Sequence, residues 1–242
     1  MIYMFDVDGT LTEPRQKMSD QFEKMFSKWM NKKKVFLVTG SDIAKVREQV
    51  PQHILDKCSG VFTCMGNELY LDNKLALSAD IQIPGQLKGW LEQQVEFSDC
   101  PTKTSNHLEW RTGMLNFSVV GRAATNEQRK EYCRWDKISG ERNRIANFIN
   151  NKYPELEACI GGEISIDIQG RGKNKSQAYK WVKEKYDEPV YFFGDKCKDG
   201  GNDSAIAKEI DKPHSNDYYM NVDGPHQLID FLLEMEEECL DI

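Results

Sequence analysis

The residues Ile2-Tyr-Met-Phe-Asp6-Val-Asp8-Gly-Thr10 are the most informative in this chain. An apolar run of β-formers that ends in two acids predicts a buried strand from Ile2 to Val7, with both aspartates at its end. Asp6 and Asp8 share a face if the strand continues, and they diverge once the chain turns. Two carboxylates this close imply a bound divalent cation or a shared proton, whereas a lone Asp-x-Asp is more typical of a turn or helix cap.

The segments beyond this strand alternate between helix and strand patterns. Ser19 is a suitable N-cap for the first helix, and Pro51 stops the second. The predicted elements are strands at 35–38, 60–64 and 190–193 and helices at 19–31, 43–50, 175–181 and 226–235. Short buried strands separated by helices are typical of βαβ crossovers, so the predicted fold class is α/β with a mainly parallel sheet.

Between residues 80 and 171 the pattern changes, because pairs of strands flank helices. The predicted elements are a helix at 86–95, strands at 107–110 and 114–120, one long helix at 126–150, and strands at 156–160 and 163–168. Thr125 and Gln128 fit a capping box before the long helix, and Trp110, Met114 and Leu115 are expected in the core. This α+β pattern predicts an inserted domain at 80–171 and a core domain formed by 1–79 and 172–242.

The composition excludes several classes of protein. The chain has 242 residues, of which 39% are hydrophobic and 29% charged, as in an ordinary globular protein of two domains. No apolar run reaches the roughly 18 residues that span a bilayer. The apolar run at the start of the chain is too short for the apolar core of a secretory signal. The formal charge of −7 argues against partners such as nucleic acid or anionic membranes. Seven scattered cysteines without a C-x-x-C pair fit unpaired thiols in a reducing cytoplasm.

Further polar groups follow the predicted elements of the core. They are Thr39-Gly40-Ser41 after the second strand, Lys175 at the start of the helix after the insertion, and Gly194-Asp195 and Gly200-Gly201-Asn202-Asp203 after the strand at 190–193. The carboxyl ends of parallel strands converge on one crevice. Paired aspartates, hydroxyls, a lysine and distal acids indicate a magnesium-dependent phosphoryl-transfer site, with an aspartate as nucleophile and the lysine and metal offsetting charge.

This set of motifs, in this order, resembles the haloacid dehalogenase superfamily of phosphotransferases. The resemblance implies a Rossmann-like parallel-sheet core with an inserted α+β cap, in which Asp6 is the nucleophile and Asp8 the general acid/base. It also implies Mg²⁺ held by Asp6, the carbonyl of Asp8 and Asp195, with Asp203 supporting the metal. Ser41 would be a phosphate ligand, and Lys175 would be the charge partner.

Four longer segments are similar to the eukaryotic-type phosphomannomutase family. They are residues 5–15, 110–122, 162–167 and 192–203, and the resemblance extends from Met4 to about Leu233. It implies that a hexose phosphate is bound by Arg15, Arg111, Arg122, Arg129, Ser165 and Asp167. It further implies a homodimer joined through the caps.

Some positions depart from the family. Thr39 stands where glycine is usual, and residues 64–68 replace a Glu-Asn-Gly turn. Residues 169–174 lack the usual Phe-Pro-x-Gly-Trp-Asp, although Lys175 keeps its place. Residues 204–212, where the family has a second cation site, diverge too far for its ligands to be assigned. These departures leave open how the hinge behaves, which sugar is preferred and whether a second cation is bound, and they do not affect the core chemistry.

Three functions fit this sequence to different degrees. The favoured one is a phosphohexomutase that interconverts mannose 6-phosphate and mannose 1-phosphate for GDP-mannose synthesis, through a phosphorylated Asp6 and a hexose 1,6-bisphosphate activator. The same core motifs would serve a magnesium-dependent sugar-phosphate phosphatase, and only the full arginine set favours the mutase. A non-catalytic sugar-phosphate sensor could lose Asp6 or Asp8 freely, and both are present. Mannose against glucose is left open.

Overall fold

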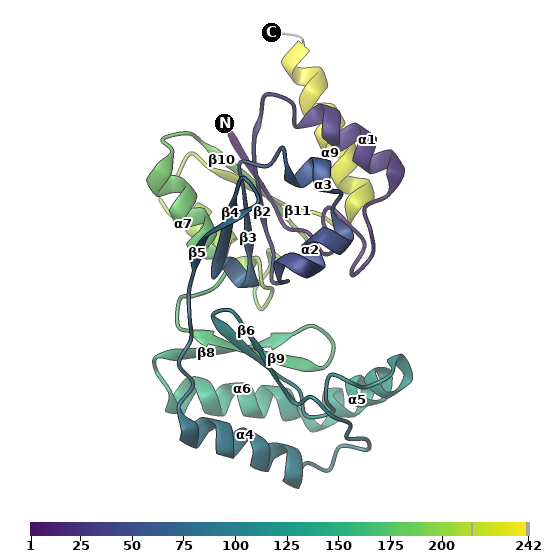
Figure 1. Cartoon of the computed structure of the whole chain (residues 1–242), viewed down its shortest axis with the longest axis vertical. Helices are drawn as coiled ribbons and strands as arrows, with labels where there is room; N and C mark the ends of the chain where they lie inside the picture. Colours follow the sequence, from purple (N-terminus) through teal and green to yellow (C-terminus); the bar gives the residue numbers. More distant parts are fainter. Residues whose placement is uncertain (214, 241–242) are drawn as a thin grey trace. The chain divides into compact units, whose positions relative to one another are not determined.

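The chain folds into two compact units, which are seen in Figure 1. The computed structural model describes residues 1–213 and 215–240, without the side chains of 237–240. The core unit comprises Met1–Ser78 and Lys173–Ile242, and the cap unit comprises Ala79–Gly172. The junctions expected from the sequence, after residues 79 and 171, each lie one residue from the observed ones.

The core unit is built on a seven-stranded sheet in the order β11-β10-β1-β2-β3-β4-β5. Its strands are β1 (Ile2–Phe5), β2 (Lys34–Val38), β3 (Gly60–Thr63), β4 (Glu68–Leu71), β5 (Lys74–Ser78), β10 (Val190–Gly194) and β11 (Tyr218–Asn221). The strands from β11 to β3 are parallel, and β4 and β5 are antiparallel. Phe5 lies opposite Leu37 on β2 and Phe193 on β10, so these three strands end at one edge of the sheet.

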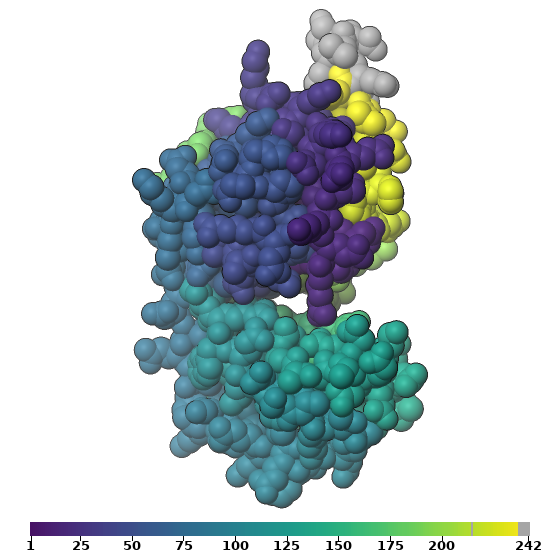
Figure 2. All heavy atoms as spheres, turned by 45° about the vertical axis from the view of Figure 1, so that its right-hand side comes forward, coloured from purple at the N-terminus to yellow at the C-terminus, as the bar shows by residue number. Residues whose placement is uncertain are grey.

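Helices cover both faces of the core sheet (Figure 1). They are α1 (Asp20–Trp29), α2 (Ile43–Gln49), α3 (Gln52–Leu55), α7 (Ser176–Lys185), α8 (Ser204–Ile210) and α9 (Pro225–Leu240). Ser19 caps α1, because its hydroxyl accepts from the amide of Phe22 at 3.3 Å. The apolar faces of α1 and α9 pack in one cluster, and Figure 2 shows the purple α1 and the yellow α9 side by side. Phe5 meets Phe26 of α1 edge to face at 5.2 Å, a contact worth about 0.5–1.5 kcal/mol beyond burial.

The cap unit is a four-stranded antiparallel sheet with helices on one face. The strand order is β6-β7-β9-β8, with β6 (Leu108–Arg111), β7 (Met114–Phe117), β8 (Leu156–Gly161) and β9 (Ser165–Gly170). The helices are α4 (Gly85–Phe97), α5 (Asn126–Ser139) and α6 (Glu141–Lys152). Alternate strand residues such as Leu115, Phe117 and Ile168 face these helices in one apolar cluster. The opposite face of the sheet is therefore left to the polar residues of the same strands.

The single helix expected at 126–150 is wrong, because Gly140 divides it into α5 and α6. Gly140 has φ of 65°, a left-handed conformation that ends a helix and that glycine adopts without steric cost. Asp136 then accepts from the backbone amide of Arg142 at 2.9 Å and from its Nε at 2.7 Å, which fixes the turn. The capping box at Thr125 and Gln128 is confirmed.

Several short elements are not found by sequence patterns. They are α3, β4, β5, α8 and β11. The β4–β5 hairpin turns at Asp72 and Asn73, which both have positive φ, as a two-residue type I′ turn requires.

The expectation that Trp110 is in the core is also wrong. Trp110 lies on the edge strand β6 and is 52% exposed, whereas Met114 and Leu115 are buried as expected.

Two further sequence expectations concern membranes and cysteines. Among the helices that the structure describes, none combines the length and the apolar character needed to cross a membrane. Six cysteines are free thiols, namely Cys58, Cys64, Cys100, Cys133, Cys159 and Cys197. The side chain of Cys239 lies outside the described residues.

Candidate active site

Asp6 and Asp8 lie in the turn that follows β1, at the carboxyl edge of the core sheet. The amide of Asp6 donates to the carbonyl of Phe193 on β10 at 2.9 Å, which fixes Asp6 between two strands. The chain then turns at Gly9, whose φ is 89°. A Cβ atom at Gly9 would lie 2.4 Å from Oδ2 of Asp195, so both the turn and the close approach require glycine. Because the strand ends before Asp6, the two aspartates point in different directions.

Lys175, which immediately precedes α7, is a fully buried cation between two carboxylates. Its Nζ lies 2.5 Å from Oδ1 of Asp6 and 2.7 Å from Oδ1 of Asp203. Burial alone would lower the pKa of Lys175, but the two carboxylates outweigh it and raise the pKa, so the lysine is charged. The other oxygen of Asp203 accepts from the backbone amide of Lys196 at 3.1 Å. Lys175 therefore joins the turn after β1 to the loop after β10.

Asp6, Asp195 and Asp203 form what we call the acidic cluster. Each offers one carboxylate oxygen, and the three oxygens lie within 4.8 Å of one another. Burial raises the pKa of Asp6 to about 7, against the lowering effect of Lys175 and with a further raising effect from Asp203. Oδ1 of Asp195 is buried without a hydrogen-bond partner among the described residues. An all-oxygen donor set with excess negative charge and a spare lone pair fits a hard divalent cation such as Mg²⁺.

Asp8 has different surroundings from Asp6. Its Oδ1 accepts from the backbone amide of Arg15 at 2.9 Å and from Nε2 of Gln49 at 2.8 Å. Its Oδ2 accepts from the hydroxyl of Ser41 at 3.2 Å. Ser41, expected as a phosphate ligand, thus lies at the same edge of the sheet and contacts Asp8. Asp8 remains partly accessible to solvent.

The polar face of the cap sheet carries what we call the arginine cluster, formed by Arg111, Arg122 and Glu109. Nε of Arg111 donates to Oε1 of Glu109 at 2.6 Å, and Nε of Arg122 donates to Oε2 at 3.0 Å. Nη1 of Arg122 also donates to the hydroxyl of Ser165 at 3.2 Å. Burial would raise the pKa of Glu109, but the two guanidinium groups lower it overall. Glu109 therefore stays ionised and holds both arginines in place.

Asp167 lies on the same face of the cap sheet, opposite Asn116 in the strand register. Nδ2 of Asn116 donates to Oδ1 of Asp167 at 2.5 Å. A Cβ atom at Gly161 would lie 2.4 Å from Oδ2 of Asp167, so glycine at this position makes room for the carboxylate. Burial raises the pKa of Asp167, and the bond from Asn116 and the charge of Arg111 partly offset that effect.

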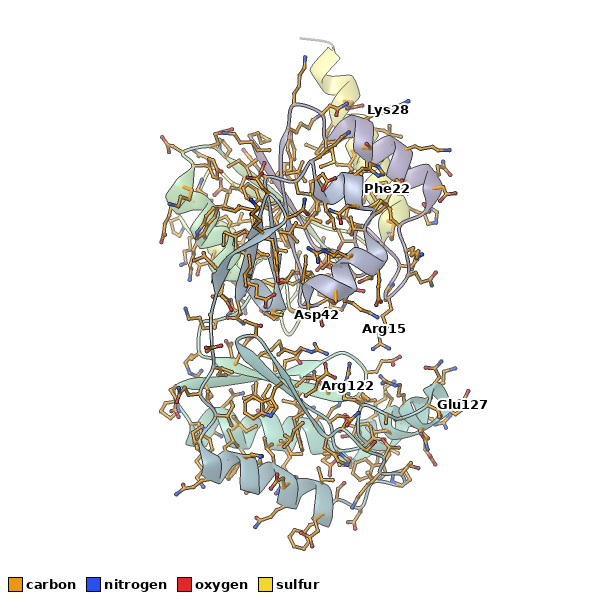
Figure 3. All side chains as sticks on the ribbon, viewed as in Figure 1. Arg15, Phe22, Lys28, Asp42, Arg122 and Glu127 are labelled. Carbon is orange, nitrogen blue, oxygen red and sulfur yellow. The ribbon has the colours of Figure 1, made fainter. Side chains whose placement is uncertain are left out.

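The remaining predicted arginines lie near these clusters. Nε of Arg129 donates to the carbonyl of Ala124 at 3.0 Å, and its Nη2 donates to that of Arg122 at 2.9 Å. Arg129 therefore braces the loop that carries Arg122. Figure 3 shows Arg122 on the side of the cap sheet that faces away from α4. Arg15 is exposed, and Figure 3 shows it at the same edge of the core unit as Asp42, the N-cap of α2.

Three residues of these sites are missed by sequence reasoning, namely Gln49, Glu109 and Asn116. Gln49 follows Val46 at helical spacing, so it is a polar residue on the buried face of α2. Glu109 and Asn116 are partners in the β6–β7 register, and each alternates with apolar residues along its strand. A polar residue among buried positions was the available signal in each case, but the residue that it contacts could not be read from the sequence.

Comparison with known sequences gives a consistent result. Residues 22–223 match the family model for eukaryotic phosphomannomutase. A phosphomannomutase of Encephalitozoon cuniculi is 33% identical over 218 residues, covering 87% of this chain and 85% of that protein. A phosphomannomutase of Saccharomyces cerevisiae is 34% identical over 213 residues, covering 85% of this chain and 84% of that protein.

Comparison with solved structures shows the fold. The C-terminal domain of a trehalose-6-phosphate phosphatase from C. albicans matches with a TM-score of 0.65 at 14% identity, covering 98% of this chain and 91% of that one. An IMP-nucleotidase from Plasmodium falciparum matches with a TM-score of 0.60 at 15% identity, covering 98% of this chain and 68% of that one. At such low identity these likenesses establish a common α/β architecture and no common substrate.

Proposed function

This chain belongs to the eukaryotic phosphomannomutase family, and from that premise we propose that it interconverts mannose 6-phosphate and mannose 1-phosphate. Such an enzyme is an isomerase that acts as an intramolecular phosphotransferase. The observation that carries the proposal is the arginine cluster with Ser165 and Asp167, a set of anion and hydroxyl ligands on the cap unit. Hydrolysis of a phosphate ester needs the acidic cluster, whereas a mutase must also hold the phosphate that does not react.

The transfer step uses Asp6 as the nucleophile. Its Oδ1 is held by Lys175, while Oδ2 accepts a longer bond, 3.3 Å, from the hydroxyl of Thr10. Oδ2 is therefore the oxygen that attacks phosphorus. The bond between phosphorus and the sugar oxygen breaks as the bond between phosphorus and Asp6 forms, and Asp8 gives a proton to the departing oxygen. In the reverse direction Asp8 takes a proton from the attacking sugar hydroxyl.

Mg²⁺ would be held by Asp6, Asp195 and the carbonyl of Asp8, with Asp203 close by. When bound, it offsets the negative charge of the transferring phosphoryl group. Lys175 adds a second positive charge next to the nucleophile, and Asp203 keeps that ammonium in place. Lys175 therefore holds the loop after β10 next to Asp6 before any sugar binds.

The cap residues bind the rest of the substrate. Arg122 and Arg111 present guanidinium donors that Glu109 holds in a fixed orientation, so little freedom is lost when they meet a phosphate. Arg129 supports them, and Arg15 adds a cation from the core unit. Asp167, already fixed by Asn116, accepts from sugar hydroxyls together with Ser165. Within one turnover, phosphorylated Asp6 gives its phosphoryl group to the sugar phosphate, the resulting bisphosphate reorients, and Asp6 takes back the other phosphoryl group. Asp6 must therefore be phosphorylated first, and hexose 1,6-bisphosphate supplies that phosphoryl group.

The cellular setting is also proposed. The product supplies GDP-mannose synthesis in the cytoplasm, and the net charge of −7 argues against nucleic acid and anionic membranes as partners. A homodimer through the caps is supported by family membership and by the exposed Trp110 on the edge strand β6. Light scattering of the wild type and of Trp110→Glu tests this arrangement, since a purely monomeric wild type contradicts it.

The decisive assay supplies mannose 1-phosphate and Mg²⁺, with and without glucose 1,6-bisphosphate, and follows mannose 6-phosphate and free phosphate together. A mutase forms mannose 6-phosphate only with the activator and releases little phosphate. If free phosphate dominates instead, the protein is a sugar-phosphate phosphatase with the same nucleophile, and the role given to the arginine cluster is wrong.

A further inference from the structure

Gln49, the last residue of α2, is buried against Asp8. Its side chain is among the least exposed polar groups of the core unit, at 2% exposure of the residue. Nε2 lies 2.8 Å from Oδ1 of Asp8 and 3.2 Å from Oγ1 of Thr12. Its backbone carbonyl also accepts from the amide of Met18 at 2.8 Å. One residue thus ties α2 to both ends of the loop that begins at Asp8.

The chemistry of the partners fixes the orientation of the Gln49 amide. An ionised Asp8 can only accept, and the hydroxyl of Thr12 donates its proton to the carbonyl of Val7 at 3.3 Å, so it accepts as well. Both neighbours therefore require the NH₂ group, and the reversed amide would place oxygen against oxygen.

This arrangement leaves Oε1 of Gln49 buried without a hydrogen-bond partner in the described part of the chain. An unsatisfied buried oxygen weakens the fold, and an apolar side chain of similar size would avoid that loss. Stability therefore does not explain why a glutamine is found here. The hydrogen bond to Asp8 explains why this residue is a glutamine.

The two oxygens of Asp8 are consequently unequal. Oδ1 accepts from two N–H groups, of Arg15 and of Gln49, which cannot accept a proton in return. Oδ2 accepts from the hydroxyl of Ser41, which can rotate and become the acceptor when Oδ2 is protonated. We propose that Gln49 is a positioning residue that keeps Oδ1 of Asp8 an acceptor and leaves Oδ2 as the atom that exchanges the proton with the sugar oxygen. This inference rests on the proposed function of the site.

The affected step can be written in full. As the phosphoryl group moves from the sugar oxygen to Asp6, the electron pair of the broken bond goes to that oxygen, and the proton on Oδ2 of Asp8 joins it to give a hydroxyl group. A sugar alkoxide is a poor leaving group and needs this proton. Acetate, which leaves from acetyl phosphate, is a good leaving group and does not.

The leaving group therefore provides the test. The rate of Asp6 phosphorylation is measured in single turnovers of full-length protein with Mg²⁺, using glucose 1,6-bisphosphate or acetyl phosphate as donor. Gln49→Met, which removes both side-chain hydrogen bonds, is expected to slow the reaction with the bisphosphate by about 10-fold or more and that with acetyl phosphate by less than about 2-fold. Gln52→Met is the matched control, because its amide donates to Oδ1 of Asp56 at 2.8 Å on the surface. It should change neither rate.

A second variant guards against misfolding. Gln49→Leu fills the same buried site with apolar atoms and removes the donor without placing a second carboxylate beside Asp8, so it should show the same selective loss with a normal thermal unfolding curve. Equal slowing with both donors, in folded variants, would show a merely structural role, and no slowing with either would show that Gln49 does not position Asp8. If the wild type accepts phosphate from acetyl phosphate but not from the bisphosphate, the mutase proposal fails. Mannose 6-phosphate then replaces the bisphosphate as donor, and the ratio of its rate to the rate with acetyl phosphate still decides the role of Gln49.

Discussion

The acidic cluster of the core unit and the arginine cluster of the cap unit balance their charges in different ways. Lys175 and Asp203 are fully buried, and burial raises the pKa of Asp6 to about 7. The side chains of Arg111 and Arg122 keep 20% and 24% of their surface exposed, and Glu109 keeps 37%. Water can replace a lost partner in the arginine cluster but not in the acidic one. Single substitutions should therefore have severe effects in the core and graded effects in the cap.

The largest effect is expected from Asp6→Asn. An amide cannot form the phosphorylated intermediate, so turnover of mannose 1-phosphate should fall by about 10,000-fold or more, as when other catalytic nucleophiles are removed. Intact-mass measurement after exposure to glucose 1,6-bisphosphate should show no phosphorylated protein. Asp56→Asn, on the surface of the core unit, is the control and should behave as wild type. Retention of a phosphorylated state by Asp6→Asn would move the nucleophile elsewhere.

Lys175→Met tests the claim that burial makes the acidic cluster depend on one cation. It leaves Asp6 and Asp203 buried without their partner, which should lower the free energy of unfolding by about 3–5 kcal/mol. Lys180, on the same helix α7, pairs with Glu209 at 3.0 Å but has a half-exposed side chain. Lys180→Met should cost less than about 1 kcal/mol. Urea unfolding of both variants without Mg²⁺ makes the comparison, and equal losses would show that burial is not the deciding factor.

Arg122→Ala tests the cap in the same way. Its guanidinium group makes charge-assisted bonds worth about 1.5–3 kcal/mol, so KM for hexose phosphates should rise about 10- to 100-fold. The folded state should survive, because water can solvate the carboxylate of Glu109. Arg134→Ala, on the exposed side of α5, is the matched control. An Arg122→Ala protein with wild-type substrate affinity would contradict the assignment of this cluster to the substrate.

The smallest effect is expected on the pH dependence of Mg²⁺ binding. The pKa of Asp6 is raised to about 7, so below that pH the carboxyl carries a proton that the metal must displace. The affinity for Mg²⁺ should fall about 10-fold from pH 8 to pH 6, with little change above pH 8. Calorimetric titration in two buffers of different ionisation enthalpy measures the protons released. Asp6→Asn should remove the release, and a pH-independent affinity in the wild type would show that burial does not hold a proton on Asp6.

The acidic cluster could be foreseen from the sequence because its residues follow short buried strands in a parallel sheet. The position of each strand is encoded locally, and the parallel arrangement alone brings Asp6 and Asp195 to one edge. Gly140 shows the opposite case, since helical spacing on both sides concealed the break between α5 and α6. The contact of Gln49 with Asp8 is a tertiary one, between a helix end and a turn 41 residues away. No pattern in the sequence specifies such a partner.

The pairing of β1 with β10 also governs the order in which the chain can fold. Residues 2–5 lie in the middle of the core sheet, yet their partners are residues 190–193, on the far side of the whole cap sequence. During synthesis the cap unit can complete its own contacts, while one side of β1 stays an open strand edge until β10 emerges. Such long-range pairing makes folding slow and leaves an unpaired strand edge open to aggregation. The pairing that places Asp6 at the edge of the sheet thus makes the nascent chain dependent on residues 190–193.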